Sequence, residues 1–331
     1  MKRFMVSATL LLWVVAAQAV GVPELSLSRL TNDSDVVVVG QVVSVETGQT
    51  IVTWRDKQLP GRAYQTTVTV LRVIKGSAPS QFSLQYGIPL QRLGMRQVEN
   101  GTRLLFLKRE LNDTFAITSL YYASLPALES VASQKYSSPL DAVISEVGAV
   151  LTSSQSATDD KYRAAWAGAS EERFTPYLKE GVDSIADPQL RATLIALLIG
   201  RGDISHVDEY PKLLTDFTAQ GALRSNLLAA IRAMKHPATI PVISTLLKSS
   251  DVEVRRQAVQ ALQDNQSPKA DLLLKASLQD SDLQVQLNAI HGLAKRHNVP
   301  GVTLGLQEFS DHHETYIRNF SKMSVSQTTN R

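Results

Sequence analysis

The fold of this chain is decided by the stretch Asp251-Val252-Glu253-Val254-Arg255-Arg256-Gln257-Ala258-Val259-Gln260-Ala261-Leu262. Its pattern returns 31 residues later as Asp282-Leu283-Gln284-Val285-Gln286-Leu287-Asn288-Ala289-Ile290. Two earlier segments, 190–198 and 223–231, align with these two, and the successive intervals are 33, 31 and 31 residues. Apolar residues at helical spacing that recur with a fixed period predict stacked helix pairs, an α-solenoid.

Prolines keep nearly the same period. Pro237, Pro268 and Pro300 are separated by 31 and 32 residues, and each is expected to open the second helix of a pair, where a missing N–H is harmless. Ile317-Arg318 follows Val285-Gln286 by 32 residues, which indicates a truncated last repeat.

The two quoted segments resemble HEAT repeats, particularly the short HEAT-like type found in phycobilisome lyases and many bacterial proteins. The resemblance covers about residues 187–320. It implies a solenoid that presents an extended surface, while any chemistry has to be argued from individual sites.

Basic residues recur at one position of the repeats, where Gln286 takes the place of one arginine. One reading is a basic ladder for an anionic partner. The favoured reading is structural, because Asp251 and Asp282 stand at helix starts, where a carboxylate accepts backbone N–H groups and can pair with an arginine. The predicted structural ladder consists of Arg191, Arg224, Asp251, Arg255, Asp282 and Arg318.

The first half of the chain has a different period. β-Branched and alternating segments at 35–45, 64–74, 81–87, 104–107 and 115–118 predict five or six strands after a short helix near 24–30. A small antiparallel barrel is the expected arrangement. The fold class is therefore β plus all-α, with a β-barrel followed by an α-solenoid.

Three segments of this half carry a second resemblance: 34–42, 67–76 with its terminal Lys75-Gly76, and 101–107. They resemble the netrin-like module, an OB-type barrel shared with tissue inhibitors of metalloproteinases. That family chelates a protease zinc through an N-terminal cysteine. The chain has no cysteine, so the resemblance implies the fold and a binding role without that mechanism.

The N-terminus is typical of a secretory signal. Lys2 and Arg3 precede an apolar stretch, and Ala17-Gln18-Ala19 offers small residues at the positions that a signal peptidase reads. We expect cleavage after Ala19 and an exported, periplasmic or secreted protein of bacterial origin. The alternative is an uncleaved anchor, although the apolar stretch is short for a membrane span.

The change of pattern along the chain predicts a signal peptide at 1–19, a barrel domain at 20–136 and a solenoid domain at 137–331, with a linker near 133–139. Removal of the signal leaves 32 basic and 31 acidic side chains, so no nucleic-acid partner is expected. The absence of cysteine excludes disulfide scaffolds, thiol catalysis and cysteine–zinc sites.

Catalytic, cofactor and metal sites are not expected. The chain contains no G-x-S-x-G, H-E-x-x-H or phosphate-binding glycine-rich motif. Six histidines occur, and a single His-Glu dyad, His313-Glu314, is too little for the paired ligands of a metal site. We interpret all six as surface or structural residues.

The barrel loops are the candidate contact sites, because tryptophan and arginine dominate binding hot spots. The segments 53–62 and 90–96 are expected to be loops that carry Trp54, Arg55, Arg62, Arg92 and Arg96. The alternative for Trp54 is that it covers the end of the barrel.

These observations predict a non-enzymatic scaffold or adaptor that binds a protein or peptide through the solenoid and the barrel loops. One alternative is a protease inhibitor that acts through the barrel. Another is a lyase-like or chromophore-handling repeat protein.

Overall fold

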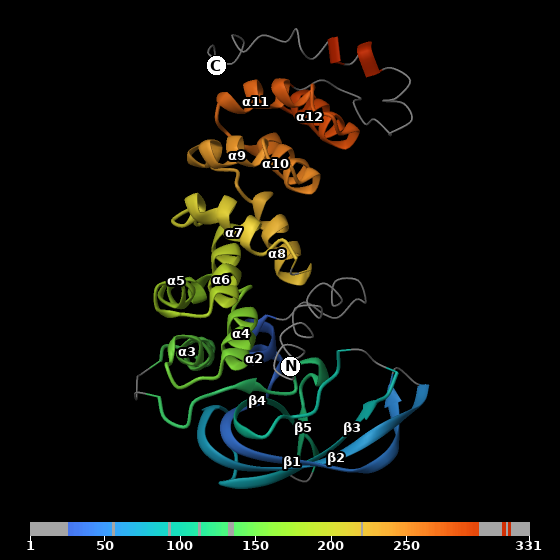
Figure 1. The fold of residues 1–331 in the computed structure, drawn as a ribbon. Helices are drawn as coiled ribbons and strands as arrows, with labels where there is room; N and C mark the ends of the chain where they lie inside the picture. The colour runs from blue at the N-terminus through green and yellow to red at the C-terminus, as the bar shows by residue number, and fades with distance from the viewer. Residues whose placement is uncertain are drawn as a thin grey trace. The chain divides into compact units, whose positions relative to one another are not determined.

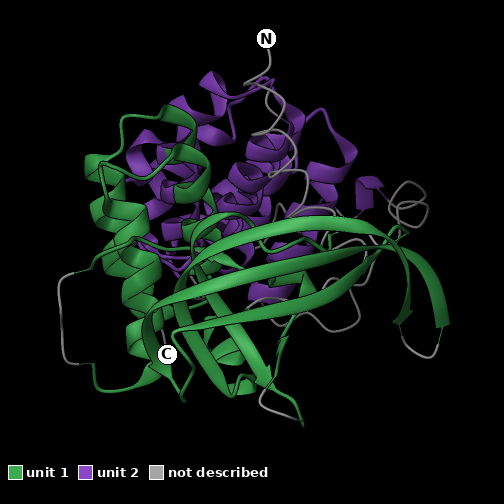
Figure 2. Ribbon diagram, turned by 90° about the horizontal axis from the view of Figure 1, so that it is seen from below, with its two compact units in different colours: residues 1–190 green, residues 191–331 purple. Residues whose placement is uncertain are grey.

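The computed structural model describes residues 26–54, 57–91, 94–111, 114–131, 136–219, 221–297, 313–315 and 317–318, with the backbone alone for Trp54. The chain divides into two compact units, residues 1–190 and 191–331 (Figure 2). The first contains an antiparallel β-barrel and several helices, and the second is helical. The predicted fold class, β plus all-α, is confirmed.

Six antiparallel strands form one sheet with the order β3-β2-β1-β4-β5, and β6 pairs with β4. The long β1 lies between β2 and β4. Its first residues, 36–39, are β-branched, which suits a central strand. The strands are β1 (Val36–Trp54), β2 (Lys57–Lys75), β3 (Gln81–Pro89), β4 (Gly101–Arg109), β5 (Phe115–Ile117) and β6 (Leu125–Pro126).

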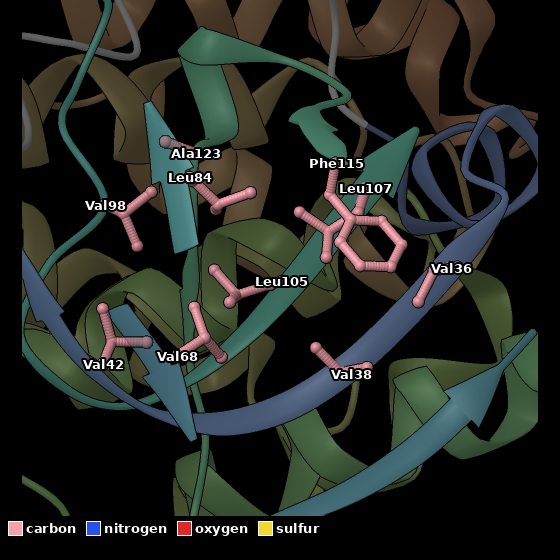
Figure 3. Close-up of a cluster of buried hydrophobic side chains, with 10 residues drawn as sticks. All are labelled: Val36, Val38, Val42, Val68, Leu84, Val98, Leu105, Leu107, Phe115 and Ala123. Atoms are coloured by element: carbon pink, nitrogen blue, oxygen red, sulfur yellow. The ribbon is translucent and has the colours of Figure 1, made fainter. Parts of the chain in front are cut away.

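The sheet curls into a nearly closed barrel around an apolar core (Figure 3). Val38, Val68 and Leu105 are fully buried in it. The two edge strands meet through aromatic rings, since Phe82 of β3 and Phe115 of β5 have ring centroids 4.8 Å apart. Burial of such side chains stabilises a domain by about 1.5–3 kcal/mol each.

The β1–β2 hairpin is longer than the sequence predicts. The segment 53–62, expected as a loop, continues both strands, and Trp54 is still registered with Lys57. Pro60 lies inside β2. Its missing N–H is tolerated because β3 is registered with β2 only as far as Gly61, and at Pro60 the β3 side keeps just the bond from the Leu90 N–H to the Pro60 carbonyl.

Among the described residues of the first unit, four α-helices accompany the barrel before α6 begins at Pro188 (Figure 1). α3 begins at Pro139, the last residue of the predicted linker 133–139, and residues 133–135 of that linker lie outside the described residues. A domain boundary at 137 stays a prediction, since the compact units meet at 190 and 191. The helices are α2 (Leu27–Asp33), α3 (Pro139–Thr152), α4 (Thr158–Ala167) and α5 (Thr175–Ser184).

In the second unit, two layers of helices follow one another along the chain, α7, α9 and α11 in one and α8, α10 and α12 in the other (Figure 1). Pro237 opens a short 3-10 turn before α9, and Pro268 is the N-cap residue of α11. Pro300 lies outside the described residues. The helices are α6 (Pro188–Gly200, which begins in the first unit), α7 (Tyr210–Asp216), α8 (Gly221–Ile231), α9 (Ile240–Leu246), α10 (Val252–Asp264), α11 (Lys269–Ser277) and α12 (Leu283–Arg296).

Candidate protein-binding surfaces

Two helices of the solenoid begin at the repeated aspartates. The side chain of Asp251 accepts the backbone N–H of Glu253 at 2.9 Å at the start of α10. Asp282 does the same for Val285 at 3.0 Å at the start of α12. Both residues therefore satisfy N–H groups that the first helical turn leaves without partners.

Arginines of the preceding repeat reach these caps. Arg224 of α8 forms an ion pair with Asp251, and Arg256 of α10 binds Asp282 with Nε and Nη2 at 3.0 and 2.7 Å. The hydrogen bond from Arg256 lowers the pKa of Asp282, although burial opposes it. Each pair thus joins one repeat to the beginning of the next.

Arg255 has a different partner from the predicted ladder. Its Nε and Nη2 bind Asp280 at 2.8 and 3.0 Å, and its Nη1 donates to the Ser249 carbonyl at 3.0 Å. One repeat later, Gln286 uses its amide to donate to the Asp280 carbonyl at 2.6 Å. Arg255 and Gln286, which occupy the same repeat position, therefore both bind Asp280 in the loop before α12.

The two ends of the predicted ladder differ. Arg191 of α6 binds both carboxylate oxygens of Glu209, at 2.6 and 3.0 Å. That hydrogen bonding, with a further one from His206 and against the effect of burial, lowers the pKa of Glu209 to about 2. Arg318 is exposed in a short helical piece.

Sequence reasoning missed three members of these pairs: Glu209, Arg256 and Asp280. Asp280 lies two residues before the cap Asp282, and Arg256 directly follows Arg255. The local signal was therefore two arginines in a row and two aspartates close together. Which arginine binds which aspartate depends on residues that are 25 and 26 apart along the chain.

The outer face of α10 and α12, here the α10–α12 face, presents polar side chains of intermediate exposure. Gln260 and His291 stand 31 residues apart at one repeat position, as do Glu253 and Gln284. Partial burial lowers the pKa of His291. The face therefore offers hydrogen-bond donors and acceptors with little net charge.

The long hairpin carries one of the predicted barrel contacts. Arg62 is exposed and lies 3.1 Å from Glu46 of the neighbouring strand. The backbone of Trp54 ends β1, and Arg55 lies outside the described residues, as does Arg92 in the second predicted loop. The sequence-based grouping of these arginines stays a prediction.

Arg96 belongs to a cluster of charges in the first unit. Its Nη1 lies 4.0 Å from Glu99, which also pairs with Arg103 of β4 and Arg163 of α4. Burial, and then the neighbouring Arg163, lowers the pKa of Arg96. Arg103 also meets Asp160 at 3.2 Å. This arrangement joins α4 to the barrel, so Arg96 is part of a packed charge network.

The far end of the hairpin, together with the end of β3, forms a three-stranded arm (48–54, 57–63 and 87–90). Ile51 is registered with Pro60, whose carbonyl accepts the N–H of Leu90 at 2.9 Å. Directly opposed residues share one face. Ile51 and Leu90 are 62 % and 57 % exposed on it, so this face of the arm presents two large apolar side chains to solvent, with the exposed Arg62 beside them.

The histidines have protein partners or neighbours where they are described. His206 Nδ1 lies 3.0 Å from Glu209, His297 Nε2 lies 3.0 Å from Asp271, and His313 Nε2 lies 2.7 Å from Gln286 Oε1. Among the described residues, no three His, Asp or Glu side chains gather as metal ligands. Within the same part of the chain, every helix is too short or too polar to cross a membrane.

Comparison with known proteins bears on the helical half. The family model of HEAT repeats matches residues 211–294, about a quarter of the chain. No curated protein matches the chain. The helices α7 to α12 are therefore HEAT-like, as the period of 31 residues predicts, and repeats of this kind suggest an interaction scaffold. The netrin-like identity of the barrel stays a resemblance.

Proposed function

We propose that the protein is an exported, non-catalytic scaffold that binds a protein or peptide through its HEAT-like repeats. The observation that carries the proposal is the HEAT-repeat match over 211–294 on two continuous helix layers. Stacked repeats bury a shared core and leave a long surface whose side chains change from repeat to repeat. Such a surface suits an extended partner.

The α10–α12 face supports a polypeptide partner. Gln260 and Gln284 supply carboxamides, which both donate and accept hydrogen bonds. Residues 137–331 hold 20 basic and 22 acidic side chains, a balance that gives no electrostatic attraction for nucleic acid. The chemistry fits the mixed donors and acceptors of a protein surface.

The barrel is proposed as a second, netrin-like contact module. Its arm exposes Ile51 and Leu90 beside Arg62, which combines apolar area with a charged rim as binding patches do. Protease inhibition and chromophore handling stay predictions from the two resemblances.

Affinity capture from an envelope extract with the full chain tests the proposal. The double variant Gln260→Arg/His291→Arg places two charges on the α10–α12 face and should lose the captured partner. The matched control Thr245→Arg/Ala276→Arg adds the same charges to exposed positions of α9 and α11, also 31 residues apart. The control should retain the partner.

Two outcomes contradict this proposal. One is that the wild-type chain captures no protein above an unrelated bait of the same charge. The other is that the control variant loses the partner while the α10–α12 variant keeps it. Circular dichroism of both variants should match the wild type, which separates lost binding from lost folding.

A further inference from the structure

The central strand of the barrel has a second half that is paired on one side. β4 is registered with β1 over residues 36–42, whereas β2 is registered as far as Trp54. The β4 side ends where Asn100 Oδ1 accepts the N–H of Ser44 at 2.6 Å. Among the described strands, none is registered with the outer edge of β1 over 48–54.

This edge lacks the charged residues and prolines that protect many edge strands. Natural edge strands carry lysine, proline or inward charges that prevent pairing with another chain. The segment Gly48-Gln49-Thr50-Ile51-Val52-Thr53-Trp54 has no charged residue and no proline. Four of its seven residues are β-branched, and Ile51 is 62 % exposed. A short, uncharged segment of high β-propensity pairs readily with an identical copy.

A bulge defines where such pairing can begin. The register shifts between Glu46 and Gly48, with Thr47 as the extra residue, and Gly48 has a φ of +135°. Bulges turn an edge away and end a ladder. From Gly48 to Trp54 the register with β2 is uninterrupted, so these seven residues form a regular edge.

We propose that the β1 edge over 48–54 pairs antiparallel with the same edge of a second copy of this chain. Identical edges related by a two-fold axis form a closed, self-complementary contact. Complete overlap of the segment places Ile51 opposite Ile51 of the second copy and Gly48 opposite Trp54. Because the segment is uncharged, self-pairing brings no like charges together.

The apolar face of the arm extends the contact. Ile51, Pro60 and Leu90 lie side by side across β1, β2 and β3. Pairing of two edges joins two such faces into one sheet, with the two Ile51 side chains at its centre. The proposal goes beyond the scaffold function, since it assigns the edge of the barrel arm to a second copy of this chain and needs no other protein.

Sedimentation velocity of the full chain over a wide concentration range tests the dimer. The wild type should shift from monomer to a species of twice its mass as concentration rises. Ile51→Lys places a charge at the centre of the edge and should weaken the dimer at least tenfold. Leu111→Lys makes the same exchange at a residue that is 88 % exposed outside the arm, and it should dimerise like the wild type.

The cysteine-free chain allows a second test of the register. In the proposed pairing, the Cβ atoms of Ile51 and its copy lie about 4.5–5.5 Å apart, near the span of a disulfide. Ile51→Cys should form a crosslinked dimer on mild oxidation, and Leu111→Cys should not. A monomeric wild type at all concentrations, an Ile51→Lys variant that dimerises normally, or equal crosslinking of both cysteine variants would each overturn the proposal.

Discussion

Lys75 and Gly76 show how two adjacent residues fasten a helix to the barrel. The Lys75 ammonium donates to the carbonyls of Thr31 and Ser34 at 2.8 and 2.5 Å, at the C-terminal end of α2. A cation there binds unpaired carbonyls and complements the helix dipole. Gly76 then turns with a φ of +72° directly against the Asp35 carbonyl. The Lys-Gly pair that ends β2 therefore has a structural cause.

Gly76→Ala should destabilise the first unit. A Cβ at this position would lie 2.4 Å from the Asp35 carbonyl oxygen, in a left-handed conformation. Such strain costs about 1–3 kcal/mol. Urea unfolding should show that loss, whereas Gly221→Ala, where a Cβ meets nothing within 4 Å, should be neutral or slightly stabilising. Equal stability of the two variants would contradict the strain argument.

Arg72 is saturated by acceptors that come from distant parts of the first unit. Its Nε and Nη2 bind Glu146 of α3 at 2.7 and 2.6 Å. Its other donors reach the carbonyls of Leu128 and Glu129, both at 2.7 Å. The Glu146 side chain is only 4 % exposed and that of Arg72 is 26 % exposed, so this partly buried pair joins the barrel to α3.

Glu146→Ala should cost about 1.5–3 kcal/mol of stability, because the partly buried guanidinium of Arg72 loses its charged hydrogen-bond partner. The free energy of unfolding in urea measures this loss. Asp216→Ala breaks the exposed pair with Lys212 and should cost less than about 1 kcal/mol. A Glu146→Ala variant as stable as Asp216→Ala would contradict the importance of the Arg72–Glu146 pair.

At the scale of elements, helix starts were predictable and helix partners were not. The N-caps Asp251 and Asp282 are read from local sequence, since a cap bonds to its own first turn. The acid that each arginine meets depends on how far one helix is shifted against the next. That shift brings Arg255 to Asp280, which no local pattern specifies.

The length of β2 could not be predicted from local sequence. Pro60-Gly61 has the composition of a turn, yet it lies inside β2. Gly61 is required there because a Cβ would lie 2.5 Å from Val52 and 2.6 Å from the Ile88 carbonyl. The glycine marks close packing in a coiled arm and not a reversal of the chain.

The solenoid should become less stable as pH is lowered, because Glu209 is protonated. Its pKa is about 2 in the folded chain against 4.5 ordinarily. The lowered pKa stabilises the folded state above pH 4.5, and this contribution is lost as pH falls toward 2. The urea midpoint of the wild type should drop across this range.

Glu209→Gln is the matching variant. It should be less stable than the wild type at pH 7 and should show a shallower decline between pH 4.5 and 2. Asp208→Asn, at the exposed neighbouring position, serves as the control and should keep the wild-type slope. A Glu209→Gln variant with an unchanged slope would contradict the role of the Arg191–Glu209 pair.

At the scale of the whole molecule, the chain combines a barrel and a solenoid without any cysteine. Neither therefore relies on a disulfide. A buried apolar cluster stabilises the barrel, and repeated ion pairs join successive repeats of the solenoid. Export, if it occurs as predicted, would not depend on disulfide formation.

Processing of the N-terminus is the prediction that belongs to the complete chain. Protein recovered from the producing cells should begin at Val20, because Ala17 and Ala19 have the small side chains that signal peptidase accepts. Intact-mass measurement and N-terminal sequencing check this. Ala19→Arg should leave the precursor uncleaved, and Val20→Ala should be processed normally. An intact precursor in wild-type cells would contradict the predicted cleavage and favour the uncleaved anchor.

The sequence by itself determined the fold class and the repeat. Alternation in the barrel strands and a 31-residue period in the helices are properties of neighbouring residues, and the physics of burial converts them directly into elements. The tertiary structure decided which charges meet and which edge stays open. Arg72 and Glu146 are 74 residues apart. The second half of β1 has no registered β4 partner because β4 begins at Gly101, opposite Val42. Both facts depend on how far elements overlap in space, which side-chain patterns along one segment do not encode.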